Sequence, residues 1–201
     1  SLSAQRHLAE TQTRLDKTFQ QLASGSKITR SSDDAAGLAI SEGLKADIRS
    51  LGTALQNAHD GISLVQVFEG GTSSISELIM RTRELAMRAS SDTMGERERA
   101  IINNEVIQLK EEMERIAQTA EFGGSKLLDG FTVGLAFQVG VGNVDEVDRI
   151  TFSPGDSDLT VDALGLEDVD VSDRDGAHDA LDAIDEALYR VNEVRARVGA
   201  V

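Results

Sequence analysis

The chain has 201 residues, no cysteine, few aromatic residues (3%) and a formal net charge of −15. The lack of cysteine excludes disulfides and thiolate metal sites, and the scarcity of aromatic anchors favours a helix bundle over a compact α/β enzyme. Eleven of the fifteen net negative charges fall in residues 145–201, which argues against a nucleic-acid partner because contact with phosphates needs positive charge.

The first forty residues predict a helix, a break and the start of a second helix. Gly25 is suited to end a helix because it takes positive φ without a Cβ clash. Ser31 stands three residues before Asp34, which is an N-capping pattern. We therefore expect a helix over residues 1–23, a connecting segment over residues 24–36 and a new helix after it.

Apolar residues then recur in alternating steps of three and four from Ile40 to Ala89, the period of a helix packed against other helices. Six glycines, Gly37 just before this run and five within it, cost about 1 kcal/mol each and would break the helix most readily at Gly70-Gly71. The apolar seam continues across that pair. We therefore expect one nearly continuous long helix, from about Asp33 to Ala89, whose main body is residues 37–90.

Two more seams follow. Thr93-Met94-Gly95-Glu96 is a second capping pattern and predicts a helix over residues 94–120, with a seam from Ile102 to Ala120. A third seam, from Ala177 to Val198, predicts a returning helix over residues 176–201. Long helices gain most of their stability from packing, so three such seams indicate a bundle.

The pattern between the second and third seams is different. Residues 131–133, 135–139 and 149–152 are rich in β-forming side chains, and the stretch from Gly140 to Asp148 can connect them. We expect a β-hairpin region over residues 130–155 and an acidic, partly irregular segment over residues 156–175. The predicted fold class is mainly α, an elongated antiparallel helix bundle (a rod) with a small β-hairpin region.

Motifs for catalysis, cofactors and metals are weak. Gly140-Val141-Gly142 lacks the third glycine of a dinucleotide loop and is typical of a hairpin turn. Residues 171–176 resemble part of a calcium loop, but the first ligand position is Val171 and the twelfth is Asp182, so a helix cap is favoured. His178 and Asp182 lie one helical turn apart, which is too few ligands for zinc. We predict no active site, no cofactor, no metal site and, since no apolar run approaches ~18 residues, no membrane span.

Several segments together resemble the conserved regions of bacterial flagellins, the subunits of the swimming filament. They occur in the expected order and are distributed over most of the length of the chain: residues 22–25, 31–41, 57–63, 81–89 (with Arg83-Glu84-Leu85-Ala86), 120–130, 137–140 and 180–201. The resemblance identifies the chain as a conserved core fragment that lacks complete terminal helices and carries no large variable outer domain. We expect such a fragment to stay soluble and monomeric.

The resemblance implies a structural protein, not an enzyme. It implies polymerisation with other flagellin subunits, secretion to the extracellular filament, and an export chaperone and hook-associated proteins as further partners. It assigns residues 1–23 to a helix of the filament core, residues 24–36 to a connecting spoke and residues 37–201 to the conserved rod domain.

A charged face on the long helix has two interpretations. Arg81, Glu84 and Arg88 stand at helical spacing away from the seam, and the simplest interpretation is a solvated face with one weak ion pair. The resemblance implies instead a surface that packs against the neighbouring subunit and that a vertebrate Toll-like flagellin receptor grips on free monomers. Its residues are Arg81, Leu85, Arg88, Ile102 and Glu105, with Leu85 expected to be exposed and to need a partner. Leu109 departs from the basic residue found in many receptor-activating relatives.

Two alternatives stay open at this point. The hook–filament junction protein is a relative that has Asp-Asp-Pro-Ala where this chain has Asp33-Asp34-Ala35-Ala36. A catalytic flagellin would carry a His-Glu-x-x-His helix, which this sequence lacks. A generic coiled-coil scaffold would explain the seams, but neither the segment around Gly25 nor the hairpin.

Overall fold

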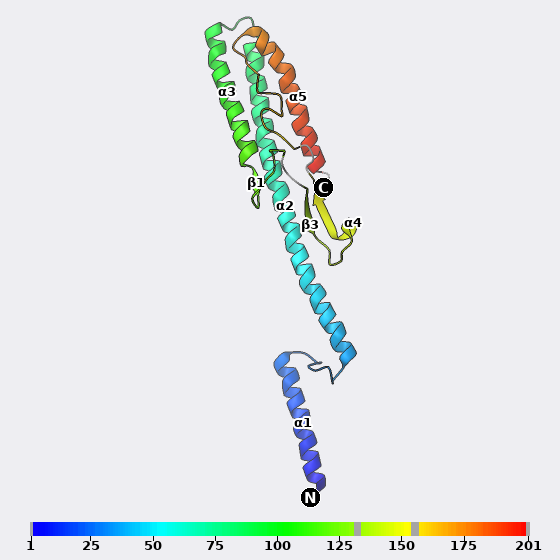
Figure 1. Ribbon diagram of the computed structural model, residues 1–201. Coiled ribbons are helices and arrows are strands. Elements are labelled where there is room, and N and C mark those ends of the chain that lie inside the picture. Colours follow the sequence, from blue (N-terminus) through cyan, green and yellow to red (C-terminus); the bar gives the residue numbers. More distant parts are fainter. Residues whose placement is uncertain (1, 131–133, 154–156, 200–201) are drawn as a thin grey trace. The chain divides into compact units, whose positions relative to one another are not determined.

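The computed structural model describes residues 2–130, 134–153 and 157–199, and these are mostly helical (Figure 1). The chain divides into two compact units, unit 1 (residues 1–53) and unit 2 (residues 54–201). The elements in chain order are α1 (Leu2–Ser24), α2 (Ala35–Ala89), α3 (Glu96–Thr119), β1 (Glu121–Phe122), β2 (Ser125–Lys126), β3 (Leu135–Gln138), α4 (Asp145–Asp148), β4 (Arg149–Phe152) and α5 (Arg174–Val198). Unit 1 contains α1 and the start of α2, and unit 2 contains the rest.

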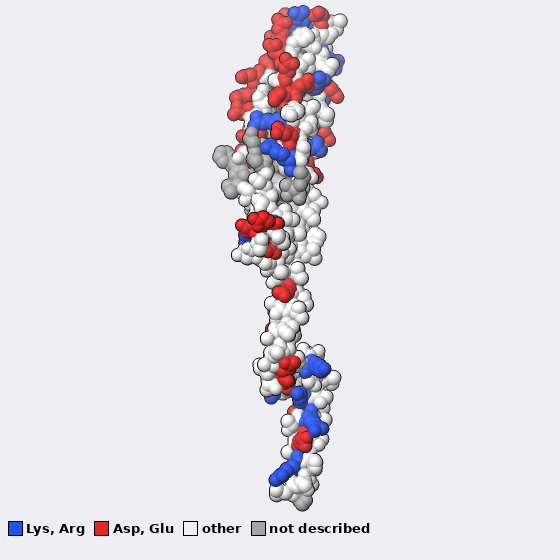
Figure 2. Space-filling model, turned by 90° about the vertical axis from the view of Figure 1, so that its right-hand side faces the viewer, with Lys and Arg blue, Asp and Glu red and all other residues white. Residues whose placement is uncertain are grey.

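The two units differ in charge. Residues 54–201 carry 29 acidic and 13 basic side chains, whereas residues 1–53 carry 6 acidic and 7 basic ones. Figure 2 shows the acidic side chains of unit 2 gathered toward the end where α2 is followed by α3, while the surface of α2 nearer the hairpin is largely uncharged. The excess negative charge of the chain therefore belongs to unit 2.

The start of α2 differs in detail from the prediction. The helix α1 ends at Ser24, and Gly25 follows with a φ of +65°, as expected. The N-cap of α2 is Asp34, whose Oδ1 accepts a hydrogen bond from the Gly37 N–H at 2.9 Å. The predicted cap, Ser31, lies one turn too early because the Asp33 N–H donates to the Arg30 carbonyl and closes a separate turn there.

The long helix is continuous through both glycines, as the seam predicted. A Cβ on Gly71 would lie 2.7 Å from Cδ1 of the buried Leu128, so this glycine permits a close contact with a core side chain. A Cβ on Gly70 would meet nothing within 4 Å. The helix thus needs only one glycine of the pair for packing.

We expect opposite effects when each of these glycines is replaced by alanine. Gly70→Ala should raise the free energy of unfolding by about 0.5–1 kcal/mol, because alanine loses less backbone entropy in a helix. Gly71→Ala makes the same entropic gain but forces Leu128 to move within a packed core, at a cost of about 1–3 kcal/mol, so stability should fall. Urea denaturation of both variants measures the difference, and equal stabilisation by the two would show that Leu128 does not depend on Gly71.

Only part of the predicted α2 seam is buried. The buried side chains of α2 begin at Ala54 and continue to Ala89. The seam residues on the N-terminal side are exposed: Ile40, Leu44, Ile48, Leu51 and Leu55. The period of the seam was predicted correctly, but within this chain the first half of the seam has no apolar partner among the described residues.

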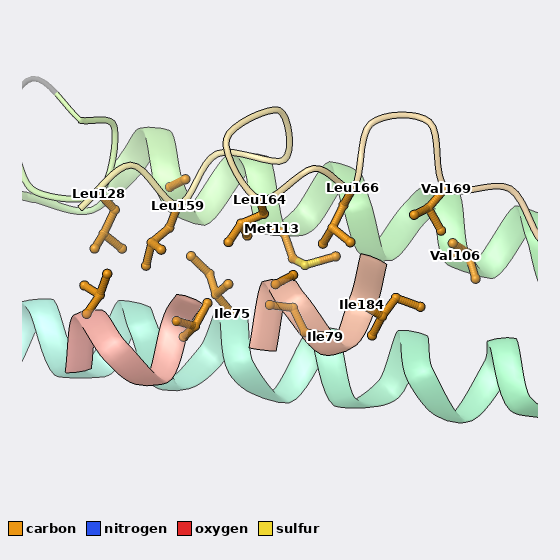
Figure 3. Packing of buried hydrophobic residues seen from close by; sticks show 14 of the residues in the cluster. Ile75, Ile79, Val106, Met113, Leu128, Leu159, Leu164, Leu166, Val169 and Ile184 are labelled. Atoms are coloured by element: carbon orange, nitrogen blue, oxygen red, sulfur yellow. The ribbon is translucent and has the colours of Figure 1, made fainter. Parts of the chain in front are cut away.

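The core of unit 2 lies between three helices and one irregular segment. In Figure 1, α3 and α5 flank α2 and both run antiparallel to it. Figure 3 shows Ile75 and Ile79 of α2, Met113 of α3 and Ile184 of α5 pointing into a common interior. The segment between β4 and α5 closes this interior with five more apolar side chains: Leu159, Leu164, Leu166, Val169 and Val171. The segment predicted to be acidic and irregular is therefore also part of the core.

Three side chains of α3 hold the backbone of that segment. Asn103 Oδ1 accepts from the Val171 N–H at 3.0 Å, and Glu114 Oε2 accepts from the Val161 N–H at 2.9 Å. Between them, Lys110 Nζ donates to the carbonyls of Glu167 and Val169, both at 2.9 Å. Buried backbone groups must find partners, and here helix side chains supply what a strand or helix ladder would.

The predicted β-hairpin is present. The strands β3 and β4 are antiparallel, with Leu135 opposite Phe152 and Gln138 opposite Arg149, whereas β1 and β2 form a separate two-residue pair. The loop between β3 and β4 contains α4 and is closed by Asp148, whose carboxylate accepts from the N–H groups of Gly142 and Val144. Residues 131–133, also predicted to be β-rich, lie outside the described residues.

The hairpin is anchored on α2. The rings of Phe68 and Phe152 meet edge to face, with centroids 5.6 Å apart. Asn57 Nδ2 donates to the Gln138 carbonyl at 2.8 Å. The hairpin is therefore part of unit 2, and Gly140-Val141-Gly142 belongs to its connecting loop, as predicted.

Of the caps predicted for the two later helices, the one for α5 was correct and the one for α3 was wrong. The N-cap of α5 is Asp173, which accepts from the Gly176 N–H at 2.8 Å, so residues 171–176 form a helix cap. The helix α3 begins at Glu96 with Gly95 as an N-cap that has no side-chain bond. Thr93 does not cap it, because its hydroxyl bonds to that of Ser91 inside the turn at 2.8 Å.

Candidate assembly surface

An ion-pair network joins α2 to α3 on the surface of unit 2. Arg81 donates to Glu105 Oε1 through Nε (3.0 Å) and Nη2 (2.8 Å), and to Glu84 Oε2 through Nη1 (3.0 Å). The hydrogen bonds to Glu105 and then to Glu84 raise the pKa of the Arg81 guanidinium above its ordinary value. The network places residue 81 of α2 beside residue 105 of α3, so Arg81 and Glu105 are brought together as the resemblance implied.

Two other residues of the predicted surface lie beneath it. Leu85 is only 3% exposed and Ile102 is 8% exposed, and both belong to the core. The expectation that Leu85 is exposed was wrong. The helix α2 is covered on two sides, by α3 and by α5, so it buries Leu85 as well as the seam residue Ala86. Arg88, in contrast, is exposed.

The most exposed large apolar residue described in this region is Ile101, which was not predicted, and Met80 and Met87 of α2 are exposed as well. Ile101 is 70% exposed and stands four residues before Glu105, so it lies on the same side of α3 as Glu105. The signal in the sequence was the pair Ile101-Ile102, because two adjacent helical residues point in directions about 100° apart and only one can follow the seam. We call Arg81, Glu84, Arg88, Ile101 and Glu105 the candidate assembly surface.

Arg99, a buried residue of α3, binds the turn between α2 and α3 (residues 90–95) next to this surface. Its Nε donates to the Ala89 carbonyl at 2.7 Å and its Nη2 donates to the Ser91 carbonyl at 2.9 Å. The Ala89 carbonyl is at the end of α2, where the helix leaves it unbonded, and the Ser91 carbonyl belongs to the following turn, where it also accepts from the Met94 N–H at 3.0 Å. Arg174, at the start of α5, also reaches Asp92 in the same turn at 3.1 Å. The end of the bundle is therefore tied together from α3 and α5.

We expect Arg99→Met to lower the free energy of unfolding by about 1–3 kcal/mol, because the carbonyl of the buried Ala89 loses this donor and the turn loses its link to α3. Arg97→Met is the matched control, since Arg97 is an exposed arginine in the same turn of α3, where solvent screens any contact of its side chain, and its removal should change stability by less than about 1 kcal/mol. Thermal or urea unfolding compares the two. An equal effect of both variants would mean that loss of charge, not loss of the two hydrogen bonds, governs stability here.

Apolar surface without a partner extends beyond unit 2. In unit 1, α1 has no buried residue, and Leu8, Leu15 and Leu22 are exposed at seven-residue spacing. This spacing is the mark of a helix face that packs against another helix. In unit 2, a largely apolar hollow of about 350 Å³ lies between α2 and the hairpin. Its walls include Ala58, Gly61, Ile62, Val65, Phe137 and Ile150.

The described residues offer neither a metal site nor a membrane-spanning helix. Among residues 2–130, 134–153 and 157–199, no group of three or more His, Cys, Asp or Glu side chains is placed to hold a metal ion. Within the same residues, no helix is both long enough and apolar enough to cross a membrane. The features that stand out are exposed apolar helix faces and a charged surface around Ile101, which suit binding to other proteins.

The sequence of residues 1–132 matches the family model described as the bacterial flagellin N-terminal helical region. The chain belongs to the flagellin family. A flagellin of Halalkalibacterium halodurans is 40% identical over 201 residues, which is all of this chain and 73% of that protein. The flagellar filament 33 kDa core protein of Treponema phagedenis is 34% identical over 216 residues, covering all of this chain and 74% of that protein.

A solved flagellin structure has a similar fold. The crystal structure of Bacillus cereus flagellin superposes with a TM-score of 0.62 at 25% identity, over 72% of this chain and 81% of that one. The mainly α fold predicted from the seams, with the small β-hairpin predicted from the β-forming residues, is thus confirmed as a flagellin fold, and the β1–β2 pair is an addition to it. The two relatives named above are a flagellin and a filament core protein, so neither favours the hook–filament junction alternative.

Proposed function

We propose that this chain is a structural subunit that polymerises with copies of itself into the bacterial flagellar filament, outside the cell, for motility. The single observation that carries this function is the match over the whole chain to a flagellin and to a flagellar filament core protein. The exposed apolar helix faces of α1 and of the first half of α2 support it, since they lack partners within the described chain. The protein acts by assembly and not by catalysis.

An open polymer follows from the kind of contact involved. When one surface of a subunit binds a different surface of the next and the rotation does not close a ring, the contact repeats without limit and builds a helical filament. We assign residues 1–23 to a helix of the filament core, residues 24–36 to a connecting spoke and residues 37–201 to the conserved rod domain. The seven-residue spacing of Leu8, Leu15 and Leu22 supports the first assignment.

The candidate assembly surface is proposed to contact the neighbouring subunit. Ile101 supplies apolar area that a partner can cover, and the Arg81–Glu105 pair beside it supplies a fixed charge pattern for register. Leu85 and Ile102 are buried in the core beneath this surface, where they hold α2 against α3. On the free subunit, the same surface is proposed to bind the vertebrate Toll-like flagellin receptor. An export chaperone and hook-associated proteins are the further proposed partners.

Ile101→Asp in the full-length protein should reduce elongation from filament seeds by at least about tenfold, because a carboxylate would be buried at the contact without a partner. Folding should not change, since the side chain is exposed. The matched control is Ile107→Asp, an exposed isoleucine of α3 that is turned about 120° away around the helix. Electron microscopy of seeded reactions, with circular dichroism to check the fold, measures both variants.

The possible outcomes separate the hypotheses. Elongation by the native chain and by Ile107→Asp, but not by Ile101→Asp, supports both the filament function and the candidate assembly surface. Normal elongation by Ile101→Asp would exclude the surface while leaving the function. Binding of the native chain at filament ends without elongation would exclude the filament subunit and favour a junction protein.

A further inference from the structure

Two methionines, Met80 and Met87, are exposed on the outer face of α2 in unit 2. They are 46% and 55% exposed, whereas Ile79 and Leu85 in the same turns of the helix are buried. Their separation of seven residues places them two turns apart on one side of α2. Because α3 and α5 pack on this part of α2 (Figure 1), the two side chains have fixed positions on a folded unit.

Both methionines border the candidate assembly surface. Around the helix, they lie about 40–60° to one side of Glu84, and Arg81 lies about 60° to its other side. Glu84 therefore stands between the methionine pair and the Arg81–Glu105 contact with α3. A neighbouring subunit that covers Arg81 and Glu84 also covers the two thioether groups.

The sulfur of Met87 has a defined polar contact. Arg83, one turn earlier, donates from Nη1 to Sδ of Met87 at 3.3 Å. The guanidinium of Arg83 is itself fixed by Asp185 of α5, which accepts from Nε at 2.6 Å and from Nη2 at 3.2 Å. A thioether sulfur is a weak acceptor, and oxidation makes the side chain polar. An oxygen added to this sulfur becomes the stronger acceptor for Arg83, so oxidation changes the shape of the surface as well as its polarity.

The other two methionines of the chain are less accessible. Met113 is fully buried and points into the core of unit 2 in Figure 3, and Met94 packs against the same core and is partly buried. An oxidant must reach the sulfur atom itself, so burial protects a methionine until the core opens. The exposed methionines are therefore those that lie beside the candidate assembly surface.

We propose that Met80 and Met87 are modification sites that peroxides convert to sulfoxides on the free subunit, and that this conversion slows the addition of the subunit to a filament. With hydrogen peroxide, the thioether sulfur bonds to one peroxide oxygen, the O–O bond breaks, and the second oxygen leaves as water with both protons. The sulfur loses two electrons, which the peroxide gains. A sulfoxide brings a polar oxygen into a contact that a thioether fills with apolar surface, so the contact weakens. The effect on assembly rests on the proposed function, whereas the assignment of the sites does not.

Peptide mass spectrometry of the full-length protein, after timed exposure to hydrogen peroxide, tests the two sites. Met80 and Met87 should each gain one oxygen at least about tenfold faster than Met113, whose sulfur is reached only when the core opens. Met113 is thus a control within the same molecule. Oxidation of Met113 as fast as that of either exposed methionine would overturn the assignment, because the reaction would then proceed through the unfolded chain.

Elongation from filament seeds tests the effect on assembly. Native subunits in which both sites are oxidised should elongate seeds at least about fivefold more slowly, and treatment with methionine sulfoxide reductases should restore the rate. The matched control is the double variant Met80→Leu/Met87→Leu, because leucine keeps the volume and the apolar character of methionine. It should elongate seeds normally both before and after exposure to peroxide.

Three outcomes would overturn the effect on assembly: normal elongation by the fully oxidised native subunit, failure of the reductases to restore elongation, or equal slowing of the native subunit and the double variant by peroxide. The reductase step needs no variant, so it decides the matter even where the double variant grows slowly before treatment. If untreated native subunits did not elongate seeds, the proposed function would fail. Mass spectrometry would then still decide whether Met80 and Met87 are the oxidation sites.

Discussion

Burial of one face of α2, from Leu64 to Ala89, is the constraint on which unit 2 depends. Two helices and an irregular segment share that face, and the glycine at position 71 lets Leu128 reach it. A helix covered from several sides needs a wide apolar face, which explains why Leu85 is buried together with Ala86. The polar side chains of α3 then satisfy the backbone of the covering segment, so that an element without regular structure is still ordered.

The distribution of charge and apolar surface between the units suits a molecule that must associate in one way only. Unit 2 carries a large excess of acidic groups, and like charges keep such surfaces apart unless a specific contact forms. Unit 1 is nearly neutral and exposes the leucines of α1. Association by apolar burial is therefore directed to helix faces, while the charged surface of unit 2 limits unspecific contacts.

Two ion pairs near the surface, Arg81–Glu105 and Lys17–Asp33, occur at places where one segment of the chain packs beside another. Pairs of this kind add little to stability, because solvent screens them and ordering both side chains costs entropy. The contribution of these ion pairs is instead to fix the position of one segment relative to another. Arg81 sets the register of α2 against α3 beside Ile101, and Asp33, just before α2, is paired with Lys17 of α1. In a polymer that repeats one contact many times, small errors of register accumulate, so such positioning matters more than the energy of each pair.

Much of the fold could be read from local patterns. The alternation of apolar residues predicted α2, α3 and α5, β-forming residues predicted the hairpin, and the order of short motifs indicated the family. These features depend on residues close together in the chain. The helix starts were less certain, since both Ser31 and Thr93 could cap a helix, and the backbone turn that each occupies decided that neither does.

Burial, in contrast, depends on partners far away in sequence. The periodicity of α2 is the same in its first and second halves, yet only the second half meets α3, α5 and residues 157–171. The choice between Leu85 and Ile101 as the exposed apolar residue was likewise decided by which sides of α2 and α3 are covered. The Lys17–Asp33 contact joins residues that no motif links. A sequence period reports which residues share a helix face, and only tertiary packing determines whether another part of the chain covers that face.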